Sequence, residues 1–163
     1  MLIALLLAAT VLGPGDVESL TASADAVVRA QVLRSSSAWA PGGRQIFTTV
    51  VLKTLETWKG AQAAEITVLV PGGEVGDISQ TVQGVAAFQE GEEVVVFLHR
   101  RGPSVFGVER MALGKFSVEG TGESPKRALR DRRGLTCQGC RPGEPDDLKL
   151  DELRTRVLES AVR

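Results

Sequence analysis

The sequence is poor in the residue types that several functional classes require. Its 163 residues include no tyrosine, five phenylalanines, two tryptophans, two cysteines and one histidine. Proteins that bind single-stranded nucleic acid stack bases on exposed aromatic rings, so the scarcity of aromatics argues against that function. A structural zinc site needs four ligands, but beyond the two cysteines there is only His99, within an apolar run, and no second CxxC pair. A zinc site within one chain is therefore disfavoured.

The chain also lacks the short motifs that carry catalysis or cofactor binding. No GxSxG or catalytic-cysteine context accompanies His99, which has no partnered nucleophile. The glycine-rich stretch 72–76 lacks the Lys-Ser/Thr pair of a phosphate-binding loop. The nearby acidic residues Glu65, Glu74 and Asp77 do not have the spacing of a calcium-binding EF-hand. We therefore predict a non-catalytic protein that uses no cofactor.

No apolar run is long enough to cross a bilayer as a helix. Residues 1–13, MLIALLLAATVLG, carry no charge, and their apolar part has the length of a signal-peptide hydrophobic region, although the positive residues that normally precede it are missing. The small residues around Ala9 would suit cleavage. We expect a secretory signal here, hence an exported protein (periplasmic, extracellular or in the cell envelope) with no stable membrane span after processing. A buried N-terminal helix is the alternative.

Residues 16–120 are predicted to form one mainly β domain. Ile46–Gly60 is the longest strand-like run, and its alternation breaks near Thr54, which indicates a β-bulge that bends one long strand. Glu93–His99 is the most continuously apolar run and should be the central strand. Asp16 is a suitable N-cap for a short helix ending at Ser23. The residues expected to be mostly buried are Val28, Val50, Leu52, Val68, Val94, Val96 and Phe116.

Further strands are predicted at Ala26–Ser35, Glu65–Val70, Val105–Arg110 and Ala112–Val118. Between them, Glu74–Gln89 is glycine-rich and only weakly alternating. We predict a long loop there with at most one short strand, and with Ile78 and Val82 facing inward. Five or six strands with a coiled long strand and flanking helices fit an OB-like barrel.

After Gly120 the core pattern stops. Residues 121–146 are polar, basic and rich in glycine and proline, and we predict a loop; residues 147–163 have the apolar spacing of an amphipathic helix. Lys126–Arg133 contains five cations, which indicates either a solvated segment or a contact with an acidic surface or phosphate. Cys137 and Cys140 would form a local disulfide in an exported chain. A redox pair, a metal site and two free thiols remain alternatives.

The order of these motifs resembles the netrin-module and TIMP-like OB-fold group, which includes small secreted bacterial proteins. In that group a strand of the type "VV.a.V" precedes a long strand ending in "KG", and a later strand carries a "G..ylvf" pattern. The matching segments are ADAVVRAQV (Ala24–Val32), TTVVLKTLETWKG (Thr48–Gly60), EITVLV (Glu65–Val70), EGEEVVVFL (Glu90–Leu98) and GKFSV (Gly114–Val118).

The resemblance implies the fold but not the best-known mechanism of the group. Its inhibitory members use a mature N-terminal cysteine to chelate the zinc of a protease. This chain has no cysteine before Cys137, so that residue cannot be carried over.

We therefore expect an exported, non-catalytic β-barrel module that binds a protein or cell-surface ligand, with proteinase inhibition by loop insertion as a special case. The alternatives are a thiol-redox or metal-handling protein acting through the two cysteines and, more weakly, a nucleic-acid-binding OB domain. The expected ligand surface combines loops Ser35–Arg44 and Pro71–Gln89 with part of the basic run. Its candidate residues are Trp39, Arg44, Glu74, Asp77, Lys126, Arg127 and Arg130.

Overall fold

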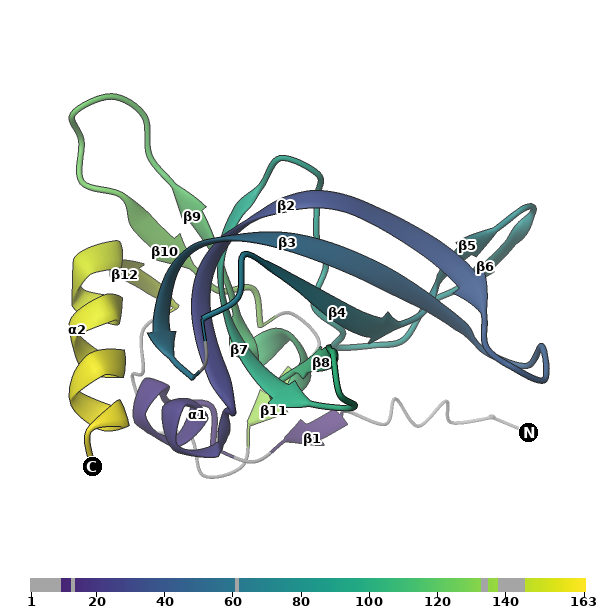
Figure 1. Ribbon diagram of the computed structural model, residues 1–163, viewed down its shortest axis with the longest axis horizontal. Helices are drawn as coiled ribbons and strands as arrows, with labels where there is room; N and C mark the ends of the chain where they lie inside the picture. Colours follow the sequence, from purple (N-terminus) through teal and green to yellow (C-terminus); the bar gives the residue numbers. More distant parts are fainter. Residues whose placement is uncertain (1–9, 13, 61, 133–134, 138–145) are drawn as a thin grey trace, which may run out of the picture.

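The computed structural model describes residues 10–12, 14–60, 62–132, 135–137 and 146–163. Within these ranges the chain is mainly β, with one short helix near the N-terminus and one helix at the C-terminus (Figure 1). The elements are β1 (Thr10–Leu12), α1 (Val17–Ser23), β2 (Ala26–Trp39), β3 (Ile46–Lys59), β4 (Glu65–Pro71), β5 (Gly73–Val75), β6 (Ile78–Gln80), β7 (Glu93–Arg100), β8 (Val105–Val108), the 3₁₀ turn η1 (Met111–Gly114), β9 (Lys115–Glu119), β10 (Arg127–Leu129), β11 (Leu135–Cys137), β12 (Asp147–Lys149) and α2 (Leu150–Ala161).

Five strands close into a barrel in the order β7-β2-β3-β4-β8, with β8 pairing back to β7. All neighbours are antiparallel except β4 and β8, which are parallel. The predicted OB-like barrel and its two flanking helices are confirmed. The interior is filled by side chains from all five strands, mostly valines, and the segment after β6 contributes Val85, Ala86 and Phe88 to the same cluster.

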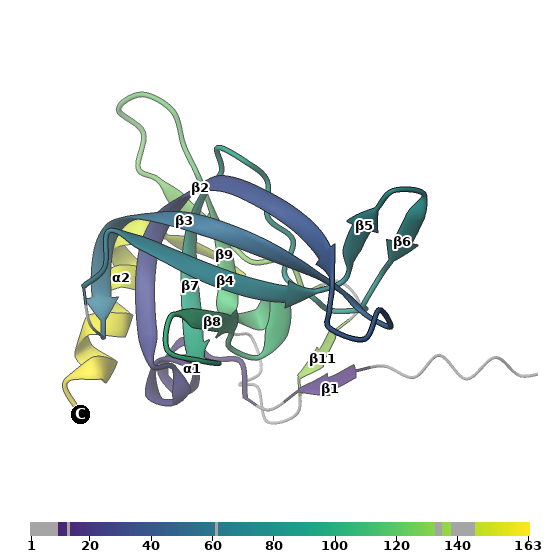
Figure 2. The same cartoon turned by 45° about the vertical axis from the view of Figure 1, so that its right-hand side comes forward.

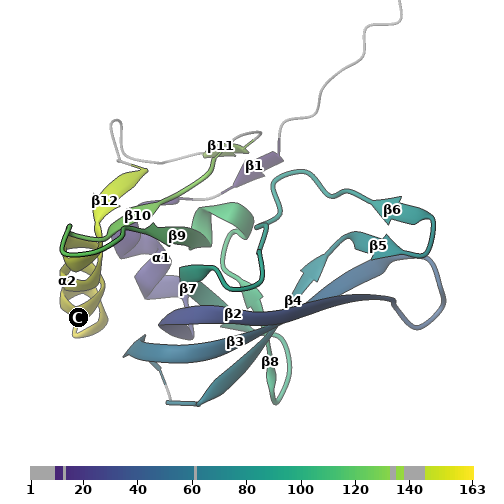
Figure 3. The same cartoon turned by 90° about the horizontal axis from the view of Figure 1, so that it is seen from above.

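A second hydrophobic cluster covers the outside of the barrel. Alternate residues of β7 point in opposite directions, so Val94, Val96 and Leu98 fill the barrel while Val95 and Phe97 face outward. The outward pair packs with both helices and with β9, β10 and β12 (Figure 3). Burial on both faces explains why this run is continuously apolar.

The outer layer, which consists of β9, β10, β12 and the two helices, forms because the sheet divides at β7. One edge of β7 pairs with β8 at residues 98–100, which closes the barrel, and with β9 at residues 94–96, which leads away from it through β10 to β12. Helix α2 packs over this extension and against α1. Glu18 of α1 accepts two hydrogen bonds, of 2.9 and 2.8 Å, from Arg156 of α2.

The expected bend in the long strand is also present. The register between β2 and β3 shifts at three places, and two of them leave Leu55 and Trp58 of β3 without an opposite residue. These bulges let β3 coil around the barrel while its first half runs outward (Figures 1 and 2). Trp58 is thereby turned into the outer cluster, whereas Leu55 stays exposed.

Burial agrees with the sequence prediction at all seven named core positions. Six of them lie in the barrel, and Phe116 lies in the outer cluster, with its ring centroid 6.2 Å from that of Phe97. Asp16 caps α1 as predicted, since its carboxylate accepts a 2.9 Å hydrogen bond from the backbone N–H of Ser19.

Two predictions about connecting segments were wrong, and the predicted start of the C-terminal helix was too early. The region 121–146 is more than a loop, because β10 pairs on both sides and Ala128 is fully buried. Residues 74–89 contain the hairpin β5–β6, and Ile78 and Val82 are exposed instead of facing inward. The C-terminal helix begins at Leu150, after the short strand β12.

Residues 1–9 and 13, most of the predicted signal segment, lie outside the described residues; Thr10–Leu12 form β1, which pairs in parallel with β11. None of the helices described is both long and apolar enough to span a membrane.

Candidate binding surface

The two segments predicted as loops meet at one end of the molecule. The loop prediction for Ser35–Arg44 was wrong in part, because Ser35–Trp39 continues β2 and forms a long arm with β3. Past the last register shift, the two strands stay paired from Arg34↔Val51 to Trp39↔Ile46. The hairpin β5–β6 lies beside the end of this arm, far from α2 and β12 (Figures 1 and 3). Segments separated by some 35 residues in sequence therefore lie side by side.

A set of short hydrogen bonds fastens the hairpin to the arm. The backbone N–H of Gly72 donates to the carbonyl of Ile46 at 2.8 Å, and Thr48 Oγ1 donates to the carbonyl of Gly72 at 2.8 Å. Gln80 Oε1 accepts from the backbone N–H of Ile46 at 2.6 Å. These bonds use the backbone of Ile46 at the end of the arm and the side chain of Thr48 two residues further along β3, so the hairpin is held in a fixed position relative to the arm.

Glycine at position 73 is required by this close approach. Its φ is +135°, and a Cβ there would lie 2.3 Å from Ser37 Oγ and 2.4 Å from Thr48 Oγ1. The two hydroxyl oxygens, Ser37 Oγ and Thr48 Oγ1, are hydrogen-bonded to each other at 2.8 Å. Any larger residue would push the hairpin away from the arm.

Four of the seven predicted surface residues lie at this end, and all four are exposed. They are Trp39 and Arg44 at the tip of the arm and Glu74 and Asp77 in the hairpin. Trp39 has 40% of its surface exposed and Ile78, also in the hairpin, has 52%. Two large apolar side chains are thus presented to solvent among charged groups of both signs.

A groove of about 500 Å³ runs between the arm and the segment after β6. Its walls combine hydroxyl and amide side chains with apolar ones, and Glu74 is the only charged residue among those that line it. Such a lining suits neutral hydrogen-bonding groups and apolar side chains better than it suits phosphate. The lining residues include Ser35, Thr48, Val50, Val70, Ser79, Gln80, Thr81, Val82, Val85 and Phe88.

The other three predicted surface residues lie elsewhere, on or next to β10. Lys126 Nζ is 2.7 Å from Glu93 Oε2, and Arg127 Nε is 2.6 Å from Asp147 Oδ1. Hydrogen bonding to Asp147 raises the pKa of Arg127. Arg127 thus pairs with the adjacent strand β12, and Lys126 pairs with β7 across the intervening β9. The charges of both cations are offset locally, which weakens the case for a phosphate-binding run.

Arg130 was expected on the ligand surface, and this prediction is wrong. Its side chain is fully buried, with Nε 2.9 Å from Asp146 Oδ1 and Nη1 donating to the carbonyls of Gly15 and Leu113. The guanidinium also lies 5.0 Å from the centroid of the Phe116 ring. Arg130 is a structural residue that joins β10 to the turn before α1 and to η1.

Sequence reasoning gave no role to a polar cluster at the start of β7. Glu92 accepts a 2.6 Å hydrogen bond from Lys115 and another from Ser117. Burial alone would raise the pKa of Glu92, but hydrogen bonds from Lys115, Ser117 and the backbone of Gln89 outweigh it and lower the pKa. The pKa of Glu93 is lowered in the same way, since Lys126 and Arg29 outweigh its desolvation. Both carboxylates are therefore structural anions.

The prediction for the two cysteines stays open. Cys140 and the side chain of Cys137 lie outside the described residues, and the backbone of Cys137 ends β11. Within the described part of the chain, no cluster of histidine, cysteine, aspartate and glutamate side chains is suited to hold a metal.

The comparisons with known proteins add no assignment to this geometry. No protein-family model matches the chain, and no curated protein matches it.

Proposed function

We propose that this protein is an exported, non-catalytic binding module that recognises a protein or cell-surface ligand through the end of the β2–β3 arm and the β5–β6 hairpin. One observation carries the proposal. Two chain segments that are distant in sequence are fastened together, and each exposes a large apolar side chain, Trp39 on the arm and Ile78 on the hairpin, while a groove runs between the segments. Exposed aromatic anchors next to a partly apolar groove are typical of protein-recognition surfaces.

The proposal also draws on the resemblance to the netrin-module and TIMP-like group. That resemblance favours a secreted module that acts through loops at one end of a barrel. Insertion of the Trp39–Ile46 loop into the cleft of a proteinase is one form that the interaction would take. Export itself rests on the apolar segment 1–13, and fractionation of the native host tests it separately: a cytoplasmic protein that retains Met1 would contradict it.

The test compares two changes in exposed apolar residues. The variant Trp39→Ala/Ile78→Ser removes both anchors at the arm end, while Leu55→Ser removes a side chain of 46% exposure from another part of β3. Each protein is immobilised and exposed to the culture medium and envelope extract of the native host. We expect wild type and Leu55→Ser to retain the same ligand and the double variant to lose it. Equal retention by all three folded proteins would contradict the proposed surface.

A further inference from the structure

A smaller pocket of about 260 Å³ adjoins the arm groove, with which it shares the lining residues Val70, Pro71, Val85 and Ala86. Its walls come from the end of β4, the end of β7, β8 and the start of η1. Most of them are apolar, including Leu69, Val70, Val108 and Met111. The two exceptions are His99 and Arg101, so all the basic groups of this pocket come from one short stretch of chain.

Three consecutive basic residues, His99, Arg100 and Arg101, lie at the end of β7, and strand alternation directs them to two different faces. Arg100 points the other way: its guanidinium lies 5.1 Å from the centroid of the Phe106 ring and donates to the carbonyl of Pro103 at 3.1 Å. His99 and Arg101 share the face that borders the pocket. Among the described residues, the side chain of Arg101 has no hydrogen-bond or ion-pair partner. Arg101 is thus a cation available to a ligand in an apolar pocket.

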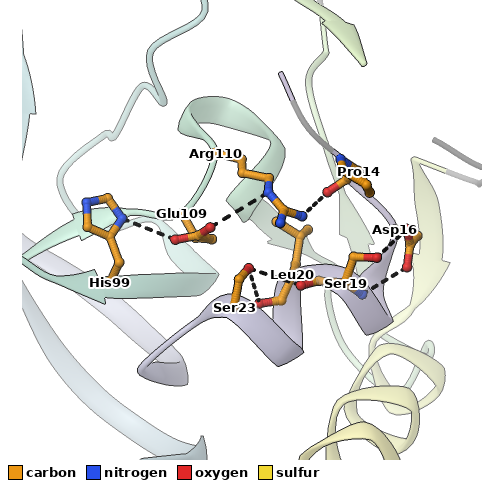
Figure 4. A network of polar contacts seen from close by, with 8 residues as sticks. All are labelled: Pro14, Asp16, Ser19, Leu20, Ser23, His99, Glu109 and Arg110. Atoms are coloured by element: carbon orange, nitrogen blue, oxygen red, sulfur yellow. Dashed lines mark hydrogen bonds and ion pairs between the residues drawn. The ribbon is translucent and has the colours of Figure 1, made fainter. Parts of the chain in front are cut away.

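His99 is held in place from its far side. Its Nδ1 atom lies 3.3 Å from Glu109 Oε2, and the close-up shows the ring aimed at this carboxylate (Figure 4). The negative charge of Glu109 is shared with Arg110, whose Nε is 3.7 Å from Oε1. With Nδ1 engaged, Nε2 is the ring nitrogen left to face a ligand.

Gly107 leaves the room for both basic side chains. It pairs with His99 across β7 and β8, and a Cβ at this position would lie 2.7 Å from His99 Nε2 and 3.0 Å from Arg101 Cδ. Gly107 does not have a positive φ, so the backbone does not require glycine. The requirement comes from the two side chains that lie against it.

The apolar wall beside these groups is built on an unusual backbone. Arg110 and Met111 are consecutive residues in the left-handed region, with φ of 49° and 57°, a conformation that is unfavourable for residues other than glycine. The Arg110 guanidinium donates to the carbonyl of Pro14, which fixes this turn to the segment before α1 (Figure 4). The turn places Met111 in the pocket wall next to His99 and Arg101.

We propose that this pocket binds a small monocarboxylate whose apolar body is no larger than a single ring. The apolar walls would take the body of the ligand, while the guanidinium of Arg101 would donate hydrogen bonds to its carboxylate. Because His99 Nδ1 faces the Glu109 carboxylate, His99 would add a donor at Nε2 only in its imidazolium form. A cavity of about 150 Å³ holds benzene, so about 260 Å³ has room for a ring and a carboxylate. The pocket shares part of its wall with the arm groove but is lined by neither Trp39 nor Ile78, and neither proposal requires the other.

Benzoate is the probe, and benzyl alcohol is its neutral counterpart of similar size. Met111 and Met1 are the only methionines, so methyl-¹³C labelling gives one reporter inside the pocket and one far from it in sequence. We expect millimolar benzoate to shift the Met111 resonance in a saturable manner. The variant Arg101→Gln should weaken benzoate at least about tenfold, because it removes a charge-assisted bond. It should leave benzyl alcohol unchanged.

Two further variants separate this site from non-specific binding. Arg100→Gln removes a neighbouring cation that faces away, and should bind benzoate like wild type. Gly107→Ala places a Cβ against the His99 ring and Arg101 Cδ without straining the backbone, and should abolish the shift while the protein stays folded by circular dichroism. The proposal is overturned if benzoate produces no saturable shift, or if Arg101→Gln and Arg100→Gln weaken it equally.

Discussion

The buried guanidinium of Arg130 offers the sharpest test of how the outer layer is held. We consider Arg130→Met, which keeps an unbranched apolar stem against Phe116 but removes the charge and its donors. The substitution leaves the carbonyls of Gly15 and Leu113 without this donor and takes one partner from Asp146. Removal of one member of a fully buried ion pair costs about 3–5 kcal/mol. Asp146 remains one-third exposed and keeps its contact with Arg132, so we expect about 2–3 kcal/mol.

Arg132→Met is the matched control, because it breaks an ion pair with the same carboxylate. Arg132 Nε lies 2.6 Å from Asp146 Oδ2, but its side chain is 34% exposed, whereas that of Arg130 is fully buried. A solvent-exposed pair contributes about 0–1 kcal/mol. Urea unfolding followed by circular dichroism gives both free energies, and Arg130→Met should also lower Tm by about 4–12 °C. Equal destabilisation by the two substitutions would refute the argument from burial.

Three further predictions concern stability. Val96→Ala should cost about 1–3 kcal/mol in urea unfolding, since it leaves a cavity inside the barrel; a change below the error of the measurement would contradict the core assignment. The folded-state pKa of Glu92 is lowered, so its stabilising contribution is complete above its unfolded pKa of about 4.5 and is lost as pH falls through the lower folded value. Glu92→Gln should therefore make the unfolding free energy fall less steeply below pH 4.5. An unchanged dependence of the unfolding free energy on pH would contradict this role of Glu92. Replacing both Cys137 and Cys140 by serine should leave the barrel folded by circular dichroism, because a disulfide across two residues closes a very short loop; global unfolding would show that the core depends on this segment.

The barrel could be predicted because its strands are long and patterned. Glu93–His99 is apolar at nearly every position, which is the signature of a strand covered on both faces, and the break in alternation near Thr54 marks the region of the bulges. In both cases many consecutive residues carry the same information, namely which faces of the strand are buried. Patterns of that length rarely arise by chance, so the predictions of a central strand and of a bulge agree with the structure.

Short elements could not be predicted for the opposite reason. Strand β10 has three residues, Arg127–Leu129, and only Ala128 reports its burial. The hairpin β5–β6 is stabilised by contacts with the arm through Thr48 and Gln80, partners that no local pattern identifies. Arg130 is a still clearer case. In sequence it belongs to a cationic run, and only the tertiary structure shows that Asp146 and two carbonyls surround it.

The arm groove and the pocket lined by His99 and Arg101 share part of their walls. Residues Val85 and Ala86 pack with the barrel core and line both hollows, as do Val70 and Pro71. The barrel strands thus provide a rigid base, and the segment between β6 and β7 determines the shape of both hollows. A change in this segment should therefore alter both sites, whereas Trp39→Ala/Ile78→Ser should affect only the arm and Arg101→Gln only the pocket. Loss of benzoate binding in the arm variant would show that the two hollows are one site.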